Sequence, residues 1–87
     1  MYVIIVYDVS VERVNKLCQF LRKYLHWIQN SVFEGELTES ELKNVEIGIK
    51  DIIDEKQDSI IIYKFQTKKF LKKYHIGIVK SEPSFVI

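Results

Sequence analysis

Residues 2–8, which read Tyr-Val-Ile-Ile-Val-Tyr-Asp, decide the fold of this chain. Six apolar or aromatic residues follow one another without a break, and most of them are β-branched. Such a run is typical of a strand that is buried on both faces in the middle of a sheet. Asp8 ends the run, just before a helical pattern begins.

Asp8 has two interpretations at this position. An Asp at the end of a strand often supports the turn into the next element. Alternatively, Asp8 binds a divalent cation, because Mg²⁺ often takes only one or two protein carboxylates and completes its shell with water and phosphate oxygens. One carboxylate is too few for a closed site, but a homodimer whose axis passed near this strand end would bring two copies of Asp8 together. The residues alone leave both interpretations open.

Two helices are predicted from apolar residues at helical spacing. The first runs from about Val11 to Tyr24 or Leu25, with Ser10 as its N-cap. The second follows Thr38, where the sequence Thr-Glu-Ser-Glu has the pattern of a capping box. Gly48 lies inside the second helix and is expected to weaken it.

The remaining apolar stretches predict strands. Residues 27–37 form either a hairpin with a turn at Asn30-Ser31 or one bent strand. Residues 60–65 read as a second central strand, and residues 74–79 as a short further strand. The resulting order, β-α-β(β)-α-β, predicts a ferredoxin-like α+β sandwich with extra C-terminal strands, formed by a single domain over residues 1–87.

Composition restricts the class of protein. A chain of 87 residues with 47% hydrophobic residues fits one small folded domain. Its single cysteine excludes an intrachain disulfide. The sequence contains neither a signal-peptide pattern nor an apolar run of membrane-spanning length, so we expect a cytoplasmic protein without membrane contact.

The charge is unevenly distributed although the net charge is only +1. Residues 34–58 carry nine acidic and three basic side chains, whereas residues 59–87 carry six basic and one acidic. A lysine run within the last part is interleaved with the aromatic residues Phe70 and Tyr74. These two could stack on bases, but their helical spacing favours core positions. The run is either a solvated surface or a phosphate-binding surface without base readout; its members are Lys64, Lys68, Lys69, Lys72 and Lys73.

Other chemistries have little support in the sequence. His26 and His75 are the only candidate bases for a nucleophilic serine, and neither lies in a recognisable motif. His26 is interpreted as a partner of the first helix dipole. The sequence has neither a zinc-ligand spacing nor a glycine-rich phosphate loop.

Three separated motifs resemble a known family. They are the strand at residues 2–8, the pattern Q-x-S-V-F-E-G at residues 29–35, and Asp-Ser-Ile-Ile-Ile-Tyr at residues 58–63. From residue 2 to about residue 65 the chain therefore resembles the small universal CRISPR-associated adaptation protein, the second family in the usual numbering, which partners the integrase of that system.

The resemblance implies a homodimer whose C-terminal region, about residues 74–87, pairs with the partner's sheet. It implies a metal-dependent endonuclease on single-stranded RNA or double-stranded DNA, with Asp8 as the ligand of Mg²⁺, for which Mn²⁺ can substitute. It also implies a scaffold that bridges integrase dimers across a short DNA duplex, which is inserted as a new spacer in antiviral defence. Phe33 matches the family's aromatic residue in S-V-F and is expected to shape the cleft.

Three hypotheses follow from these observations. In the first, Asp8 is the catalytic metal ligand of a homodimeric nuclease in spacer acquisition, and Arg13, Lys16 and the lysine run hold phosphates. In the second, the same dimer is a non-catalytic DNA-bridging scaffold in which Asp8 is structural. The third is a related ribonuclease toxin of the VapD kind, which shares the fold.

Overall fold

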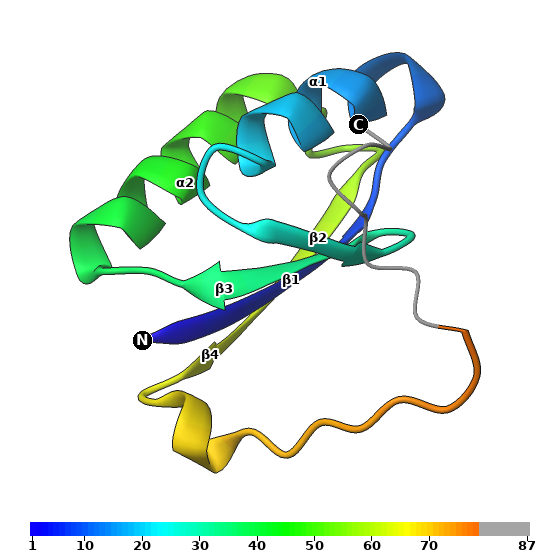
Figure 1. Cartoon of the computed structure of the whole chain (residues 1–87). Helices are drawn as coiled ribbons and strands as arrows, with labels where there is room; N and C mark the ends of the chain where they lie inside the picture. The colour runs from blue at the N-terminus through cyan, green and yellow to red at the C-terminus, as the bar shows by residue number, and fades with distance from the viewer. Residues whose placement is uncertain (79–87) are drawn as a thin grey trace.

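The computed structural model describes residues 1–78, and residues 79–87 lie outside the described part. Four strands and two helices are joined by short loops, and a single 3-10 turn follows the last strand (Figure 1). In chain order the elements are β1 (Tyr2–Asp8), α1 (Val11–Leu21), β2 (His26–Gln29), β3 (Val32–Glu36), α2 (Glu39–Ile52), β4 (Ser59–Phe65) and η1 (Lys68–Phe70).

The strands form one antiparallel sheet in the order β2-β3-β1-β4. Both helices cover the same face of this sheet, as Figure 1 shows. A β-α-β-β-α-β chain with this arrangement is a ferredoxin-like fold, and the predicted fold is therefore confirmed. β1 pairs with β3 on one side and β4 on the other, which confirms that residues 2–8 form a central strand.

Alternation along β1 separates two environments. Val3, Ile5 and Tyr7 point toward the helices and belong to the core. Ile4 and Val6 point to the opposite face and are half-buried. The prediction that β1 is buried on both faces is thus met only on the helix side, because within residues 1–78 no helix covers the other face of the sheet (Figure 1).

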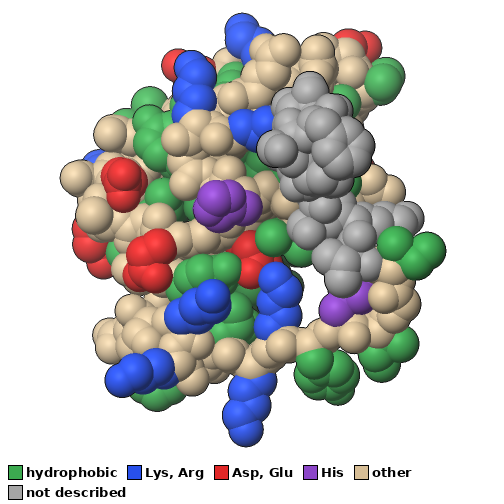
Figure 2. Space-filling model, in the orientation of Figure 1, with side chains coloured by type: hydrophobic (Ala, Val, Ile, Leu, Met, Phe, Trp, Pro, Cys, Tyr) green, Lys and Arg blue, Asp and Glu red, His purple; other side chains and the backbone are tan. Residues whose placement is uncertain are grey.

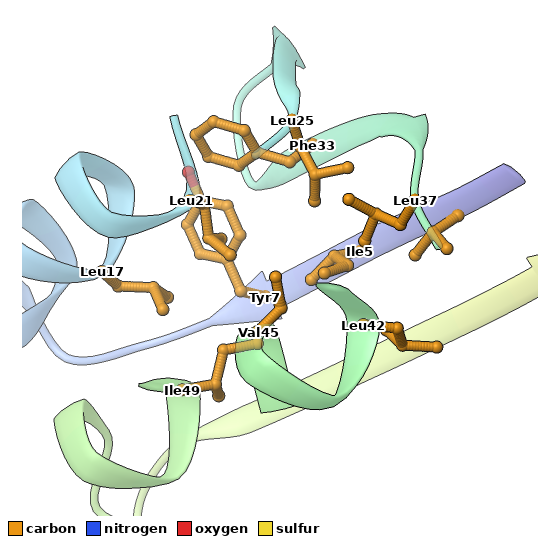
Figure 3. Close-up of a cluster of buried hydrophobic side chains, with 11 residues drawn as sticks. Ile5, Tyr7, Leu17, Leu21, Leu25, Phe33, Leu37, Leu42, Val45 and Ile49 are labelled. Atoms are coloured by element: carbon orange, nitrogen blue, oxygen red, sulfur yellow. The ribbon is translucent and has the colours of Figure 1, made fainter. Parts of the chain in front are cut away.

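The core fills the layer between the sheet and the two helices (Figure 3). Phe33 of β3 and Tyr7 of β1 lie in contact there, with ring centroids 6.0 Å apart. Side chains from both helices complete this layer; they include Leu17, Leu21, Leu42, Val45 and Ile49.

Residues 26–36 form a hairpin, which decides between the two alternatives for this stretch. Its turn contains Ser31 with φ of 67°, a left-handed conformation that few non-glycine residues adopt. The Ser31 carbonyl accepts a hydrogen bond from the backbone N–H of Tyr7 at 3.0 Å. This bond ties the turn to β1.

The helix ends differ in part from the predictions. Thr38 and Glu41 form the reciprocal capping box as predicted, with bonds of 2.9 and 3.1 Å. α1 ends at Leu21, short of the predicted Tyr24 or Leu25, because residues 22–24 form a tighter turn. Ser10 occupies the N-cap position, but its hydroxyl donates to Glu12 and does not cap the helix.

The region after β4 was predicted in part incorrectly. Residues 74–78 form no strand in the single chain. Phe70 and Tyr74 are 71% and 87% exposed and are therefore not core residues. The expected burial fails because no α-helix forms over this stretch and only the short turn η1 is present. His26 lies in β2 and not at a helix end. The predicted pairing of residues 74–87 with a partner stays a prediction, and its last nine residues lie outside the described part.

Candidate functional site

The sheet face opposite the helices is the setting of the site, and we call it the open face. Its central side chains are apolar, and two of them, Ile61 and Tyr63 of β4, are 48% and 50% exposed. Strand alternation also places Ile4 and Val6 of β1 and Val32 of β3 on this face. The open face is therefore an apolar surface in the single chain.

Asp8 stands at one end of the open face. It is the last residue of β1 and lies opposite Ser59, the first residue of β4. Its side chain is exposed and makes no hydrogen bond or ion pair with any residue between 1 and 78. A carboxylate without a protein partner at the end of a central strand is available to bind a cation or a ligand.

Asp58 lies next to this strand end in an opposite environment. Its side chain is fully buried and accepts hydrogen bonds from the backbone N–H groups of Ser10 at 3.0 Å and Asp54 at 2.9 Å. The Arg13 guanidinium donates through Nε at 2.6 Å and through Nη2 at 3.0 Å. Asp58 thus joins the loop that follows Asp8, the start of α1 and the end of α2.

Arg13 is the main cause of the electrostatic state of Asp58. Its hydrogen bonds to the carboxylate, supported by those of the Asp54 and Ser10 backbone, hold the pKa of Asp58 well below its usual range. The same contact raises the pKa of Arg13. Asp58 is therefore an ionised carboxylate whose acceptor sites are already occupied.

A second polar cluster lies at the other end of the open face. Glu34 of β3 is only 5% exposed, and its carboxylate accepts a hydrogen bond from the Tyr2 hydroxyl at 2.5 Å. Lys73 donates to the same oxygen at 2.7 Å. The ammonium of Lys68 lies 5.5 Å from the centre of the Tyr2 ring. Burial, together with the Glu34 contact, raises the pKa of Tyr2.

Comparison with known proteins places this architecture in a family. The family described as CRISPR associated protein Cas2 matches residues 1–73. The chain belongs to the Cas2 family.

Individual relatives support this assignment. The CRISPR-associated endoribonuclease Cas2 of Methanocaldococcus jannaschii is 56% identical over 81 residues, which cover 93% of this chain and 71% of that protein. The CRISPR-associated endoribonuclease Cas2 of Methanosarcina acetivorans is 49% identical over 87 residues, the full length of both. A crystal structure described as Cas2 superposes with a TM-score of 0.85 at 47% identity, covering 100% of this chain and 98% of that one.

Phe33 does not shape a cleft beside Asp8 in this Cas2-family chain. Its ring is fully buried among the helices, whereas Asp8 follows the opposite strand phase and lies on the open face. The prediction from the S-V-F motif is corrected for this reason. Phe33 supports the site only from beneath, as part of the core.

The predicted basic residues do not form one surface. Arg13 is held by Asp58 and Glu12, and Lys73 is held by Glu34. Lys64 lies beside Glu39, Ser40 and Lys43 of α2, on the helix-covered side. Lys16, Lys69 and Lys72 are exposed. Figure 2 shows Lys and Arg side chains over η1 and the segment that follows it, in the lower part of the view.

The donors for a metal ion are few in one chain. Residues 1–78 contain no group of three or more His, Cys, Asp or Glu side chains that could hold an ion together. Asp8 and the Ser59 hydroxyl opposite are the oxygen donors at the strand end. Such a set fits Mg²⁺ only when water, phosphate oxygens or a second protein carboxylate completes the shell.

Asp58 and Glu34 were missed as organising residues in the sequence. Asp58 and Arg13 interact although they are 45 positions apart in the sequence, and Lys73 and Glu34 are 39 positions apart. Periodicity does not indicate such distant pairs. The available signal was an acid within or next to an apolar stretch, because a carboxylate is costly to bury unless a cation or a donor is near. Among the described residues, no helix is long and apolar enough to cross a membrane.

Proposed function

We propose that this chain is a homodimeric nucleic-acid-binding protein of CRISPR adaptation, with metal-dependent endonuclease activity at Asp8. The observation that carries the proposal is the position of Asp8, exposed and without a partner among residues 1–78, at the end of the central strand of a Cas2-family fold. The relatives named endoribonuclease support RNA as one substrate. Duplex DNA is the second.

The open face supports the homodimer. Apolar side chains such as Ile61 and Tyr63 are half-exposed there in the single chain, and contiguous apolar surface of this kind commonly marks an interface. Packing a second copy on the open face would remove it from water. It would also bring a second Asp8 toward the first when the two-fold axis lies near that end.

The segment after η1 supports an exchange of strands. Tyr74, Ile76 and Ile78 alternate along an extended stretch and are 87%, 87% and 80% exposed. β4 is an edge strand, and a groove of about 450 Å³ lies between it and α2, lined in part by Ile49, Ile53, Ile60 and Ile62. An added strand on β4 would satisfy the edge and place apolar side chains into this groove.

Asp8 would hold Mg²⁺ or Mn²⁺ together with the second Asp8, water and substrate phosphate. When bound, the ion lowers the pKa of water and stabilises charge on a phosphodiester. Asp8 itself contributes ligand charge and position. Lys16, Lys69 and Lys72 would contact the phosphate backbone without reading the sequence. Arg13, Lys64, Lys68 and Lys73 stay candidates for phosphate contact. Arg13 and Lys73 would first have to leave Asp58 and Glu34.

A non-catalytic scaffold is the second candidate. It is favoured by the observation that Asp8 is the one carboxylate without a partner at this strand end within residues 1–78, and that no group of three or more metal-binding side chains occurs there. In this case the dimer binds duplex DNA and bridges integrase subunits during spacer acquisition, and Asp8 only supports the turn into α1. Integrase partnership belongs to both candidates.

Cleavage and binding assays on Asp8→Ala test the proposal. RNA and duplex DNA are incubated with wild type and variant in Mg²⁺, Mn²⁺ and chelator, and duplex binding is measured on the same samples. We expect wild-type cleavage to require the ion and the variant to fall to the chelator level with binding intact. Asp51→Ala, which removes an exposed carboxylate on α2, is the matched control and should cleave like wild type.

The other outcomes separate the candidates. Cleavage that persists in Asp8→Ala contradicts the assignment of Asp8. Absence of cleavage by wild type, with salt-sensitive duplex binding by all three proteins, leaves the scaffold as the function.

A further inference from the structure

Glu34 is an acidic residue in the middle strands of an otherwise apolar face. β3 lies between β1 and β2, so Glu34 lies away from both sheet edges. Glu34 pairs with Ile4 of β1, and Ile4 pairs in turn with Tyr63 of β4. A carboxylate in such surroundings needs charged or strong donors. The donors are the Tyr2 hydroxyl and the Lys73 ammonium, and we call these three residues the Glu34 cluster.

Lys73 reaches Glu34 from a distant point of the chain. β4 ends at Phe65 on one edge of the sheet, and the chain then turns through η1. To place Lys73 on Glu34, residues 66–73 must cross the open face past β1, which separates β4 from β3. Two strand spacings amount to about 10 Å. The contact therefore holds the chain away from its own β4.

The next residues continue in the same direction. His75, Ile76 and Ile78 lie beside Gln29 and Asn30, at the turn between β2 and β3. Figure 1 shows this segment below the sheet, on the side opposite the helices. Residues 74–78 thus lie away from the β4 edge of their own chain, and none of residues 66–78 pairs with that edge.

Chain length alone would permit a different arrangement. Residues 66–73 form a connection of eight residues, which is longer than most hairpin loops. It could therefore return residues 74–78 to β4 of the same chain. That hairpin would fill the edge and the apolar groove within one subunit. A contact that favours the crossing is needed to leave β4 open for a second copy.

We propose that the Glu34 cluster directs the C-terminal segment into exchange between subunits and away from a hairpin within its own chain. The proposal rests on the proposed homodimer and deepens it by naming the contact that selects the second copy as partner. Tyr2 orients the Glu34 carboxylate, Lys73 carries the segment to it, and Lys68 over the Tyr2 ring supports the same crossing.

The test compares Lys73→Glu with Lys72→Glu in the full-length protein. Both variants carry the same change in net charge. Lys72 is exposed and contacts no described partner, whereas Lys73→Glu would place a second carboxylate against Glu34 and repel it. Sedimentation equilibrium gives the dimer dissociation constant. We expect Lys73→Glu to raise it about tenfold or more, because a charge-assisted hydrogen bond is lost, and Lys72→Glu to leave it within about twofold.

Two further measurements keep the test decisive. Glu34→Lys combined with Lys73→Glu restores the pair with reversed charges and should recover dimerisation. In monomeric Lys73→Glu, hydrogen exchange should show that the β4 amides on the side away from β1 are still protected, now by the same chain. Circular dichroism checks that the variant is folded.

The outcomes are distinguishable from failure of the homodimer itself. Wild type that stays monomeric at all concentrations contradicts the homodimer, and the inference with it. A dimeric wild type with equal dissociation constants for the Lys73 and Lys72 variants overturns the inference alone. So does a monomeric Lys73→Glu whose β4 amides on the side away from β1 exchange freely.

Discussion

Two aspartates at the same end of the sheet show how surroundings assign roles to identical side chains. Asp58 is buried and its oxygens accept from two backbone N–H groups and from Arg13. Asp8 is exposed and has no partner among residues 1–78. Asp58 is suited to hold the loop after β1 in place, and Asp8 is suited to bind a cation or another ligand.

Replacing Asp58 with Asn tests the structural role through pH. The pKa of Asp58 is lower in the folded chain than its value of about 3.9 in unfolded chains, so ionisation of Asp58 stabilises the fold above about pH 4. This contribution is lost as the pH falls from about 4 toward the lower folded pKa. We expect Asp58→Asn to lower the Tm at pH 7 by several degrees and to flatten its pH dependence between pH 5 and 2.

Thermal unfolding followed by circular dichroism measures this effect. Asp51→Asn changes an exposed carboxylate on α2 that has no contact comparable to that between Arg13 and Asp58, so this variant should unfold with the same pH slope as wild type. An Asp58→Asn slope equal to that of wild type would show that Asp58 is not the group responsible.

At the scale of elements, the sequence predicted the features that depend on neighbouring residues, but not those that depend on residues far apart in the chain. The apolar run of β1 and the capping box at Thr38 lie within a few residues, and both were predicted correctly. The burial of Phe33 on the helix side, and not beside Asp8, depends on strand phase across a hairpin whose form the sequence left open. The lysine run does not form one surface, because Lys73 contacts Glu34 on the open face whereas Lys64 lies beside α2 on the helix-covered side.

Gly48 illustrates a requirement that acts between elements. A Cβ at this position of α2 would overlap the ring of Phe20 on α1, so the expected weakening of α2 accompanies close packing of the two helices. We expect Gly48→Ala to gain about 1 kcal/mol of helix propensity and lose about 1–3 kcal/mol to the overlap. The net effect is a loss of up to about 2 kcal/mol in the free energy of unfolding.

Urea unfolding in a double-mutant cycle checks this prediction. In a Phe20→Leu background the ring is absent, and Gly48→Ala should be neutral or stabilising. Asn44→Ala, at an exposed position of α2, controls for propensity alone and should stabilise slightly. Equal effects of Gly48→Ala with and without the Phe20 ring would contradict the packing explanation.

At the scale of the whole molecule, one layer of helices covers only half of the sheet surface (Figure 1). The uncovered half predicts that assembly contributes to stability, so the Tm should rise with protein concentration. Ile61→Asp on the open face tests which surface is responsible, because it places a charge among apolar side chains. Ile47→Asp on α2 is the matched control, since the two side chains are 48% and 56% exposed.

We expect Ile61→Asp to weaken dimerisation by about 100-fold or more, since burying an unpaired carboxylate costs at least about 3 kcal/mol. Its Tm should then lose the dependence on concentration, and Ile47→Asp should keep it. If Ile47→Asp were the variant that dissociates, the interface would lie on the helices, and two copies of Asp8 could not meet across the open face. The position of the interface therefore decides whether the Asp8 carboxylates of the two chains can act as a pair.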